Sequence, residues 1–199
     1  MLHCKLTAVK LVYLVLTLAM LVASQVHSTQ RSHNVAVSNA DFKNIELDSD
    51  TQNACSPDVS NHSDFIGIVI NAPTDVEFDV AERAEDGSFT VIPICGYYQL
   101  SLLELRKDSV IQLFAMNIET QDVYRGELIE EDAGSDEPFP FDVPEPEPEE
   151  IEGELLSAYF NPNFARFVSL PTSEATYKIL VQIGQAKSNI VELKVQRKD

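Results

Sequence analysis

Cysteine is the residue type of this chain that most readily does chemistry, and the sequence has three of them: Cys4, Cys55 and Cys95. Neither Cys55 nor Cys95 belongs to a CxxC motif or has a neighbouring His, so the sequence does not support a catalytic thiol. In an oxidising compartment two remaining thiols usually pair, which predicts a disulfide between Cys55 and Cys95. The alternative is a pair of buried free thiols that act as small apolar residues.

Other catalytic patterns are weak. The histidines outside the first two dozen residues, His27, His33 and His62, all fall in a polar stretch, where surface positions are expected. The sequence contains no GxSxG elbow, no short-spaced Cys/His cluster, no P-loop and no GxGxxG. With 32 acidic residues no carboxylate pair stands out, although a glycosidase-like pair stays open as a hypothesis. We therefore predict a protein that is not an enzyme and holds no cofactor or metal.

The net charge restricts the partners. The chain has 14 basic and 32 acidic residues, a formal net charge of −18, and no acid precedes Asp41. Loss of an N-terminal segment that carries only Lys5 and Lys10 would take the charge to −20. Such a charge argues against nucleic acid and against an anionic membrane surface, because both are bound through clustered Lys and Arg. We expect a protein partner, and the oligomeric state is left open.

Residues 1–24 have the pattern of a secretory signal peptide. Lys5 and Lys10 precede an uncharged, almost wholly apolar run at 11–23, and small residues allow cleavage after Ser24 or after Ser28. An uncleaved anchor is the alternative, but a bilayer needs about 20 apolar residues. The sequence therefore predicts a secreted or periplasmic protein, from which Cys4 is removed with the signal.

The mature chain begins with a polar lead-in at 25–63, for which we expect partial disorder. Its Asn61-His62-Ser63 sequence is an N-glycosylation acceptor where the source has that machinery.

From residue 64 to 199 the pattern changes to short β-type runs. Alternation at 76–80 and apolar runs at 65–70, 155–160 and 177–183 predict strands, and runs at 110–117 and 123–129 predict a hairpin. A strand over 89–95 is expected to be an edge or to carry a bulge, because Pro93 interrupts it. Residues 97–105 fit either a strand or helical turns.

Residues 130–154 differ from everything around them. Twelve of these 25 residues are acidic, none is basic, and five of the ten prolines lie here. Proline removes backbone donors and like charges repel, so the segment is predicted to be an extended, solvated insertion. It is either a spacer or an arm that binds a positively charged groove.

The stretch from Leu170 to Gln196 resembles the closing hairpin of immunoglobulin-like sandwiches. In those domains a Tyr follows a Leu-Pro turn at the start of the penultimate strand and its hydroxyl ties the corner. Leu170-Pro171 and Tyr177 match that pattern, which makes Tyr177 the candidate corner residue. Together with the strand pattern, the resemblance implies an all-β fold, an immunoglobulin-like antiparallel β-sandwich with a long acidic, Pro-rich insertion.

Three functions remain. The first is an exported, noncatalytic binding or assembly module of the cell envelope or extracellular space, with the last strand, which ends at 194–198, as an edge open to a partner strand. The second is a small-ligand or carbohydrate-binding module that stacks its ligand on tyrosines. The candidate stacking residues are Tyr97, Tyr98, Tyr124 and Tyr159. The third is a carboxylate-based hydrolase.

Overall fold

The computed structural model describes residues 37–60, 62, 64–81, 88–107, 110–128 and 147–198. The predicted signal peptide, the acceptor Asn61 and residues 130–146 of the acidic insertion lie outside these ranges. The unit described below belongs to a compact body that runs from Asn34 to Asp199. Within the described ranges, no helix has the length and apolar character needed to cross a membrane.

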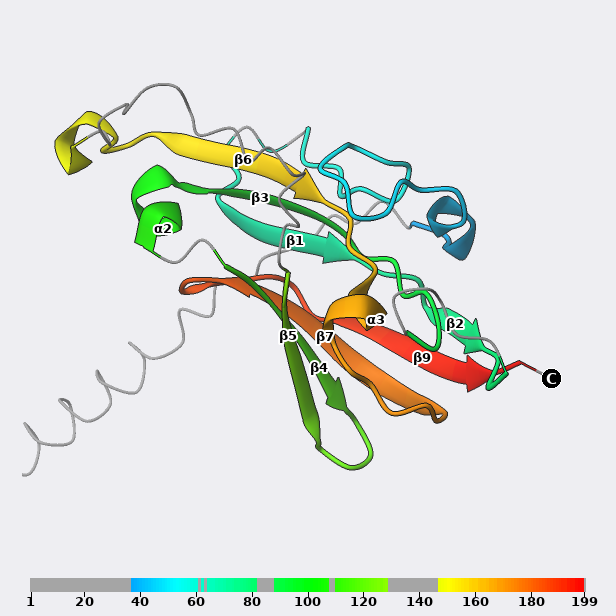
Figure 1. Ribbon diagram of the computed structural model, residues 1–199. Coiled ribbons are helices and arrows are strands. Elements are labelled where there is room, and N and C mark those ends of the chain that lie inside the picture. Colours follow the sequence, from blue (N-terminus) through cyan, green and yellow to red (C-terminus); the bar gives the residue numbers. More distant parts are fainter. Residues whose placement is uncertain are drawn as a thin grey trace, which may run out of the picture. The chain divides into compact units, whose positions relative to one another are not determined.

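Two β-sheets pack together, which confirms the prediction of a mainly β sandwich (Figure 1). The smaller sheet has the order β1-β3-β6 and is antiparallel throughout. Its strands are β1 (Gly67–Asn71), β3 (Cys95–Ser101) and β6 (Leu155–Phe160).

The larger sheet has the order β2-β9-β7-β4-β5, and the short β8 also pairs with β7. Its strands are β2 (Asp75–Phe78), β4 (Ile111–Asn117), β5 (Val123–Leu128), β7 (Ala175–Ile183), β8 (Ala186–Lys187) and β9 (Val191–Arg197). All of its pairs are antiparallel except that of β2 with β9, which is parallel.

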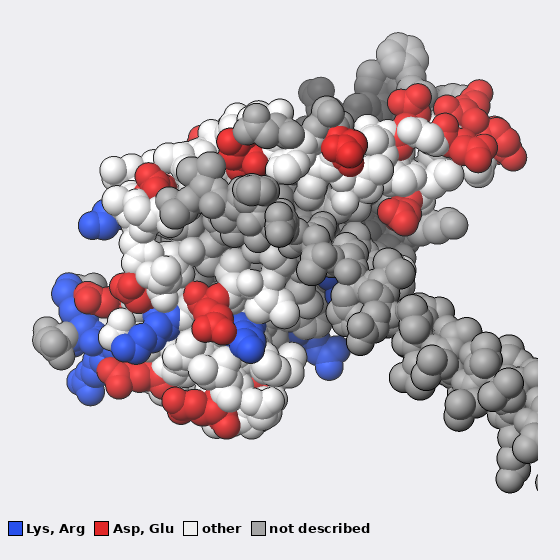
Figure 2. Space-filling model, turned by 180° about the vertical axis from the view of Figure 1, so that it is seen from behind, with Lys and Arg blue, Asp and Glu red and all other residues white. Residues whose placement is uncertain are grey.

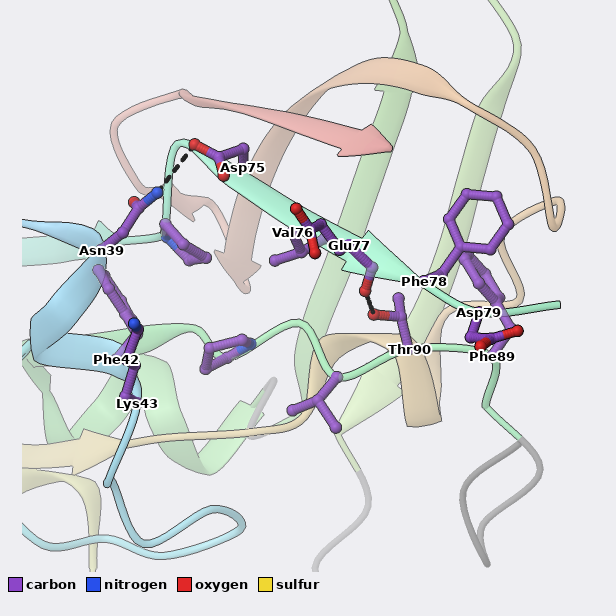
Figure 3. A pocket seen from close by; sticks show the side chains of 13 residues that line it. Asn39, Phe42, Lys43, Asp75, Val76, Glu77, Phe78, Asp79, Phe89 and Thr90 are labelled. Atoms are coloured by element: carbon purple, nitrogen blue, oxygen red, sulfur yellow. Dashed lines mark hydrogen bonds between the residues drawn. The ribbon is translucent and has the colours of Figure 1, made fainter. Parts of the chain in front are cut away.

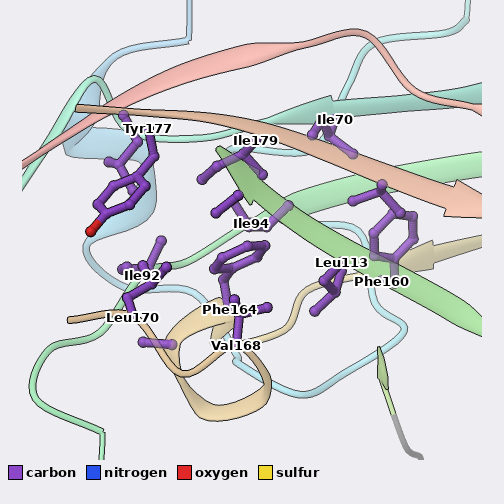
Figure 4. Packing of buried hydrophobic residues seen from close by; sticks show 14 of the residues in the cluster. Ile70, Ile92, Ile94, Leu113, Phe160, Phe164, Val168, Leu170, Tyr177 and Ile179 are labelled. Atoms are coloured by element: carbon purple, nitrogen blue, oxygen red, sulfur yellow. The ribbon is translucent and has the colours of Figure 1, made fainter. Parts of the chain in front are cut away.

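The core lies between the sheets and follows from strand alternation. In β7 every second residue from Tyr177 to Ile183 is buried, and the intervening ones are half-buried. Successive side chains of a strand point to opposite faces, so one row faces the smaller sheet. There it meets side chains such as Ile70 and Phe160 (Figure 4). Each fully buried Ile or Leu stabilises the fold by about 1.5–3 kcal/mol.

The expected strand over 89–95 is wrong. Residues 88–94 are irregular apart from an isolated bridge between Pro93 and Asn163. Pro93 has no N–H to donate to a ladder. The loop around Asn163 supplies the bonds instead: its Oδ1 accepts from the Ile92 N–H at 3.0 Å, and the Phe164 N–H donates to the Ile92 carbonyl at 2.8 Å. Phe164 begins α3 (Phe164–Phe167).

The structure also defines three regions for which the sequence gave an ambiguous or a specific expectation: residues 97–105, the hairpin and the last strand. The stretch at 97–105 is both a strand and a helix, because β3 is followed directly by α2 (Leu102–Lys107). The predicted hairpin is confirmed as β4 and β5, in antiparallel register with Phe114 opposite Arg125. The predicted edge position of the last strand is wrong, since β9 lies between β7 and β2. The strand at that edge of the larger sheet is β2, which pairs with β9. The chain enters β2 directly after β1 of the smaller sheet.

Two short 3-10 helices complete the described part, η1 (Asn39–Phe42) and η2 (Pro148–Glu150). The first belongs to the lead-in, which contacts the smaller sheet through the Cys55–Cys95 disulfide and through Asn71 of β1, whose Nδ2 donates to the Cys55 carbonyl at 2.9 Å. Asn161, directly after β6, also holds the lead-in: its Nδ2 donates to the Thr51 carbonyl at 2.6 Å, and its backbone carbonyl accepts from the Asp48 N–H at 2.7 Å.

Candidate functional site

The predicted disulfide between Cys55 and Cys95 is confirmed, with the two Cα atoms 5.8 Å apart. Both cysteines are completely buried and pack with Phe42 of η1. The bond therefore joins the lead-in to β3 rather than one sheet to the other. A disulfide is compatible with an oxidising compartment.

The four tyrosines do not form one stacking surface. Tyr97 and Tyr159 pair across β3 and β6 with ring centroids 5.0 Å apart. Tyr98 follows Tyr97 in the strand, so it points to the opposite face and packs on the core beside Phe160. Tyr124 packs edge-on against Tyr177 from β5. Only two of the four tyrosines thus share a surface, and all four are half-buried.

Tyr177 lies near the start of β7, and among the described residues its hydroxyl makes no hydrogen bond that would tie a corner. The side chain is completely buried, and within the described residues its oxygen has no hydrogen-bond partner. Figure 4 shows the hydroxyl pointing away from the labelled core residues. Burial, and secondarily the Tyr124 hydroxyl, raise the pKa of Tyr177.

Hydrogen bonds lower the pKa of two described carboxyl groups, Asp41 and Asp58. The pKa of Asp41 is lowered by hydrogen bonds from the backbone and then the side chain of Ser38. The pKa of Asp58 is lowered by hydrogen bonds from the side chain and then the backbone of Ser60. A catalytic acid needs the opposite shift.

A groove lies along the outer edge of β2 (Figure 3). Its volume is about 820 Å³. Three segments far apart in sequence supply its walls: η1, the stretch from Pro73 through β2 to Asp79, and the irregular residues before β3. The lining residues are Asn39, Phe42, Lys43, Pro73, Asp75, Val76, Glu77, Phe78, Asp79, Phe89, Thr90, Val91 and Pro93.

The helical wall of the groove is held by specific polar contacts. Ser38 begins η1, and its N–H and hydroxyl both donate to Asp41 Oδ2, at 2.8 and 2.9 Å. Asn39 then ties the helix to β2, because its Oδ1 accepts from the Thr74 N–H at 2.8 Å and its Nδ2 donates to Asp75 Oδ1 at 2.8 Å (Figure 3). The position of η1 beside β2 is thus fixed from its first residue.

The backbone of β2 presents hydrogen-bonding groups to this groove. The Thr74 carbonyl accepts from the Lys194 N–H of β9 at 3.0 Å, and the Phe78 carbonyl accepts from the N–H of Lys198, just after β9, at 2.9 Å. Backbone direction alternates along a strand, so the N–H and carbonyl groups of Asp75 and Glu77 point the other way, into the groove. The Glu77 carbonyl accepts from the Thr90 hydroxyl at 2.8 Å (Figure 3). The Glu77 N–H and the Asp75 backbone face the groove beside it.

The side chains of the groove are apolar at its floor and acidic at its rim. Phe78 and Phe89 pack edge-on with ring centroids 5.3 Å apart, and Val91 is 46% exposed. The rim carries three carboxylates, Asp75, Glu77 and Asp79, against the single ammonium group of Lys43. The groove therefore suits an extended ligand with apolar and cationic groups.

Charge is distributed unevenly over the described surface. Figure 2 shows a cluster of acidic side chains at one end, and Lys and Arg side chains mixed with further acidic ones at the opposite end. The acidic end includes the exposed residues of the insertion that the structure describes: Glu147, Glu149, Glu150, Glu152 and Glu154. In the described ranges no group of three His, Cys, Asp or Glu side chains is placed to hold a metal ion.

Comparisons with protein-family models, with curated proteins and with solved structures gave no match to this chain.

Proposed function

We propose that the protein is an exported, noncatalytic immunoglobulin-like module that binds an extended segment of a partner protein in the groove beside β2. Export rests on the pattern of residues 1–24 and agrees with the disulfide. The mode of binding is strand addition, in which main-chain hydrogen bonds give affinity and alternate side chains give selectivity.

Strand order supports the immunoglobulin-like assignment. In such domains the third, sixth and seventh lettered strands form one sheet and the first, second and fifth form the other. The orders β4-β7-β9 and β1-β3-β6 fit this scheme if β5 is the additional strand beside the third. A fourth strand would fall between β5 and β6, where residues 129–146 lie outside the described part.

The observation that carries the proposed function is the outward backbone of Asp75 and Glu77 at the wall of an 820 Å³ groove. A strand edge is a template for another strand, and a bound segment would replace the bond that the Thr90 hydroxyl makes to the Glu77 carbonyl. Three rim carboxylates favour a segment that carries Lys or Arg, and the Phe78–Phe89 floor favours apolar side chains between them. A small-molecule ligand is the second candidate, because the volume of the groove is also typical of small-molecule sites.

The test is titration of the chain from residue 25 with a short peptide of alternating Val and Lys, monitored by fluorescence anisotropy. Val91→Arg places a cation in the groove and should weaken binding by about tenfold, which corresponds to about 1.4 kcal/mol. Val110→Arg is the matched control, because Val110 has the same 46% exposure and does not line the groove. A peptide of alternating Val and Glu should bind far more weakly.

Two outcomes would contradict the proposal. Equal losses in the two Val variants would remove the groove as the binding site. Undiminished binding of a peptide with methylated backbone nitrogens would exclude strand addition. Binding of a soluble oligosaccharide that is lost in Tyr97→Ala, with no peptide binding, would favour the carbohydrate-binding alternative instead.

A further inference from the structure

The outer face of the larger sheet carries an apolar patch, separate from the groove. Phe114 and Met116 of β4 and Leu180 of β7 alternate with buried residues, so their half-buried side chains point away from the core. Around them Val123 is 61% exposed and Ile190 is 61% exposed. A contiguous exposed patch of this kind marks an interaction surface.

The charges on this face differ from those of the whole chain. The outward side chains of β2, β5, β7, β8 and β9 include four cations and four anions. They are Arg125, Lys178, Lys187 and Lys194, with Asp75, Glu77, Glu127 and Glu192. The chain as a whole has a net charge of −18. A second copy is therefore repelled less here than over an average part of the surface.

One row across the sheet is complementary to itself. The register places Lys187 opposite Gln182, Gln182 opposite Gln112, and Gln112 opposite Glu127. Residues directly opposite in a sheet share a face, so the row is cation, amide, amide, anion. When a second copy faces the first with the order of its row reversed, the two rows are complementary. Each Lys187 then faces Glu127 of the other copy, and each Gln182 faces Gln112.

The neighbouring row is complementary in shape. Phe114 lies opposite both Leu180 and Arg125, and a hollow of about 520 Å³ at the β5 edge is lined by Phe114 and Arg125 together with Arg166 and Phe167 of α3. At the other side, Ile190 directly precedes β9, whose Val191 pairs with Ile179, the residue before Leu180. The same end-for-end reversal brings Ile190 of one copy to the hollow of the other.

We propose that two copies of the chain dock through this face as an isologous dimer. The two-fold axis runs along the strands between β4 and β7. It places Phe114 of each copy on Leu180 of the other and forms two Lys187–Glu127 ion pairs. An isologous contact uses the same patch on both copies, so the patch must be complementary to itself, as the row from Lys187 to Glu127 is.

Charge reversal tests the pairing directly. In sedimentation velocity, the chain from residue 25 should dimerise, and Lys187→Glu or Glu127→Lys alone should raise the dimer dissociation constant by about tenfold, since each turns two attractive contacts into repulsive ones. Mixing the two single variants should restore the dimer, because both contacts then join a Lys to a Glu. Both positions are exposed, so the substitutions leave the core unchanged.

An apolar pair of variants gives an independent measurement. Ile190→Glu should also weaken the dimer, whereas Ile66→Glu should not, although Ile66 is 59% exposed and Ile190 61%. A monomeric wild-type chain at every concentration tested would overturn the proposal, as would single variants that dimerise normally or fail to recover on mixing. Peptide binding in the groove is measured separately, so failure here leaves that proposal intact.

Discussion

Replacing Tyr177 with Phe removes one oxygen atom from the core, and the structure predicts that this stabilises the protein. The side chain is completely buried, and its hydroxyl has no hydrogen-bond partner in the described residues. Folding therefore takes that hydroxyl out of water without compensation. Because the Phe ring has the same shape, the packing against Tyr124 should be kept.

The magnitude follows from the desolvation of one hydroxyl. An unsatisfied buried polar group costs about 1–3 kcal/mol, whereas a hydrogen bond made in the folded state stabilises by about 1 kcal/mol. Tyr177→Phe should thus raise the free energy of unfolding by about 1 kcal/mol or more. A hydroxyl that tied a corner would give the opposite sign.

Urea unfolding at neutral pH, followed by circular dichroism, measures this difference. A second readout is the dependence of stability on pH. Burial raises the pKa of Tyr177, so ionisation is easier in the unfolded chain, and this contribution to stability is lost as the pH rises above about 10. Burial likewise raises the pKa of Tyr159, so Tyr177→Phe should reduce the alkaline loss without abolishing it. A destabilised variant, or one with the wild-type alkaline profile, would refute the reasoning.

Three further predictions concern how the fold is held together. Replacing Cys55 and Cys95 with Ala should lower the free energy of urea unfolding by about 4 kcal/mol, because the bond closes a loop with a sequence separation of 40; a loss below 1 kcal/mol would contradict this account. Gly126→Ala should cost about 1–3 kcal/mol in the same assay, because an added Cβ would overlap the α3 backbone, and an unchanged midpoint would show that α3 moves aside freely. Asn189→Ala removes hydrogen bonds to the N–H and carbonyl of Ile70 at 2.8 and 2.9 Å, and should speed amide exchange at Ile70 and cost about 1–2 kcal/mol.

Most strand positions and the disulfide were accessible from the sequence because they depend on local rules, whereas the expected strand over 89–95 was wrong. The buried face of β7 follows from alternation of period two, which any tertiary context keeps once the strand forms. The β4–β5 hairpin joins neighbouring runs, so its pairing needs no knowledge of distant segments. Cys55 and Cys95 were the only thiols left outside the predicted signal, which made the partner unique.

Tertiary structure decided everything that depends on the order of strands and on contacts between distant segments. It placed β9 inside the larger sheet and made β2 the edge, because the chain crosses between the sheets after β1. The groove combines residues near 40, 76 and 90, which no local pattern relates. Tertiary structure also decided that the Tyr177 hydroxyl has no hydrogen-bond partner among the described residues, because only the packed neighbours determine whether a buried donor is satisfied. The sequence by itself determined which residues turn inward, and the long-range pairing of the strands determined which surfaces remain to bind a partner.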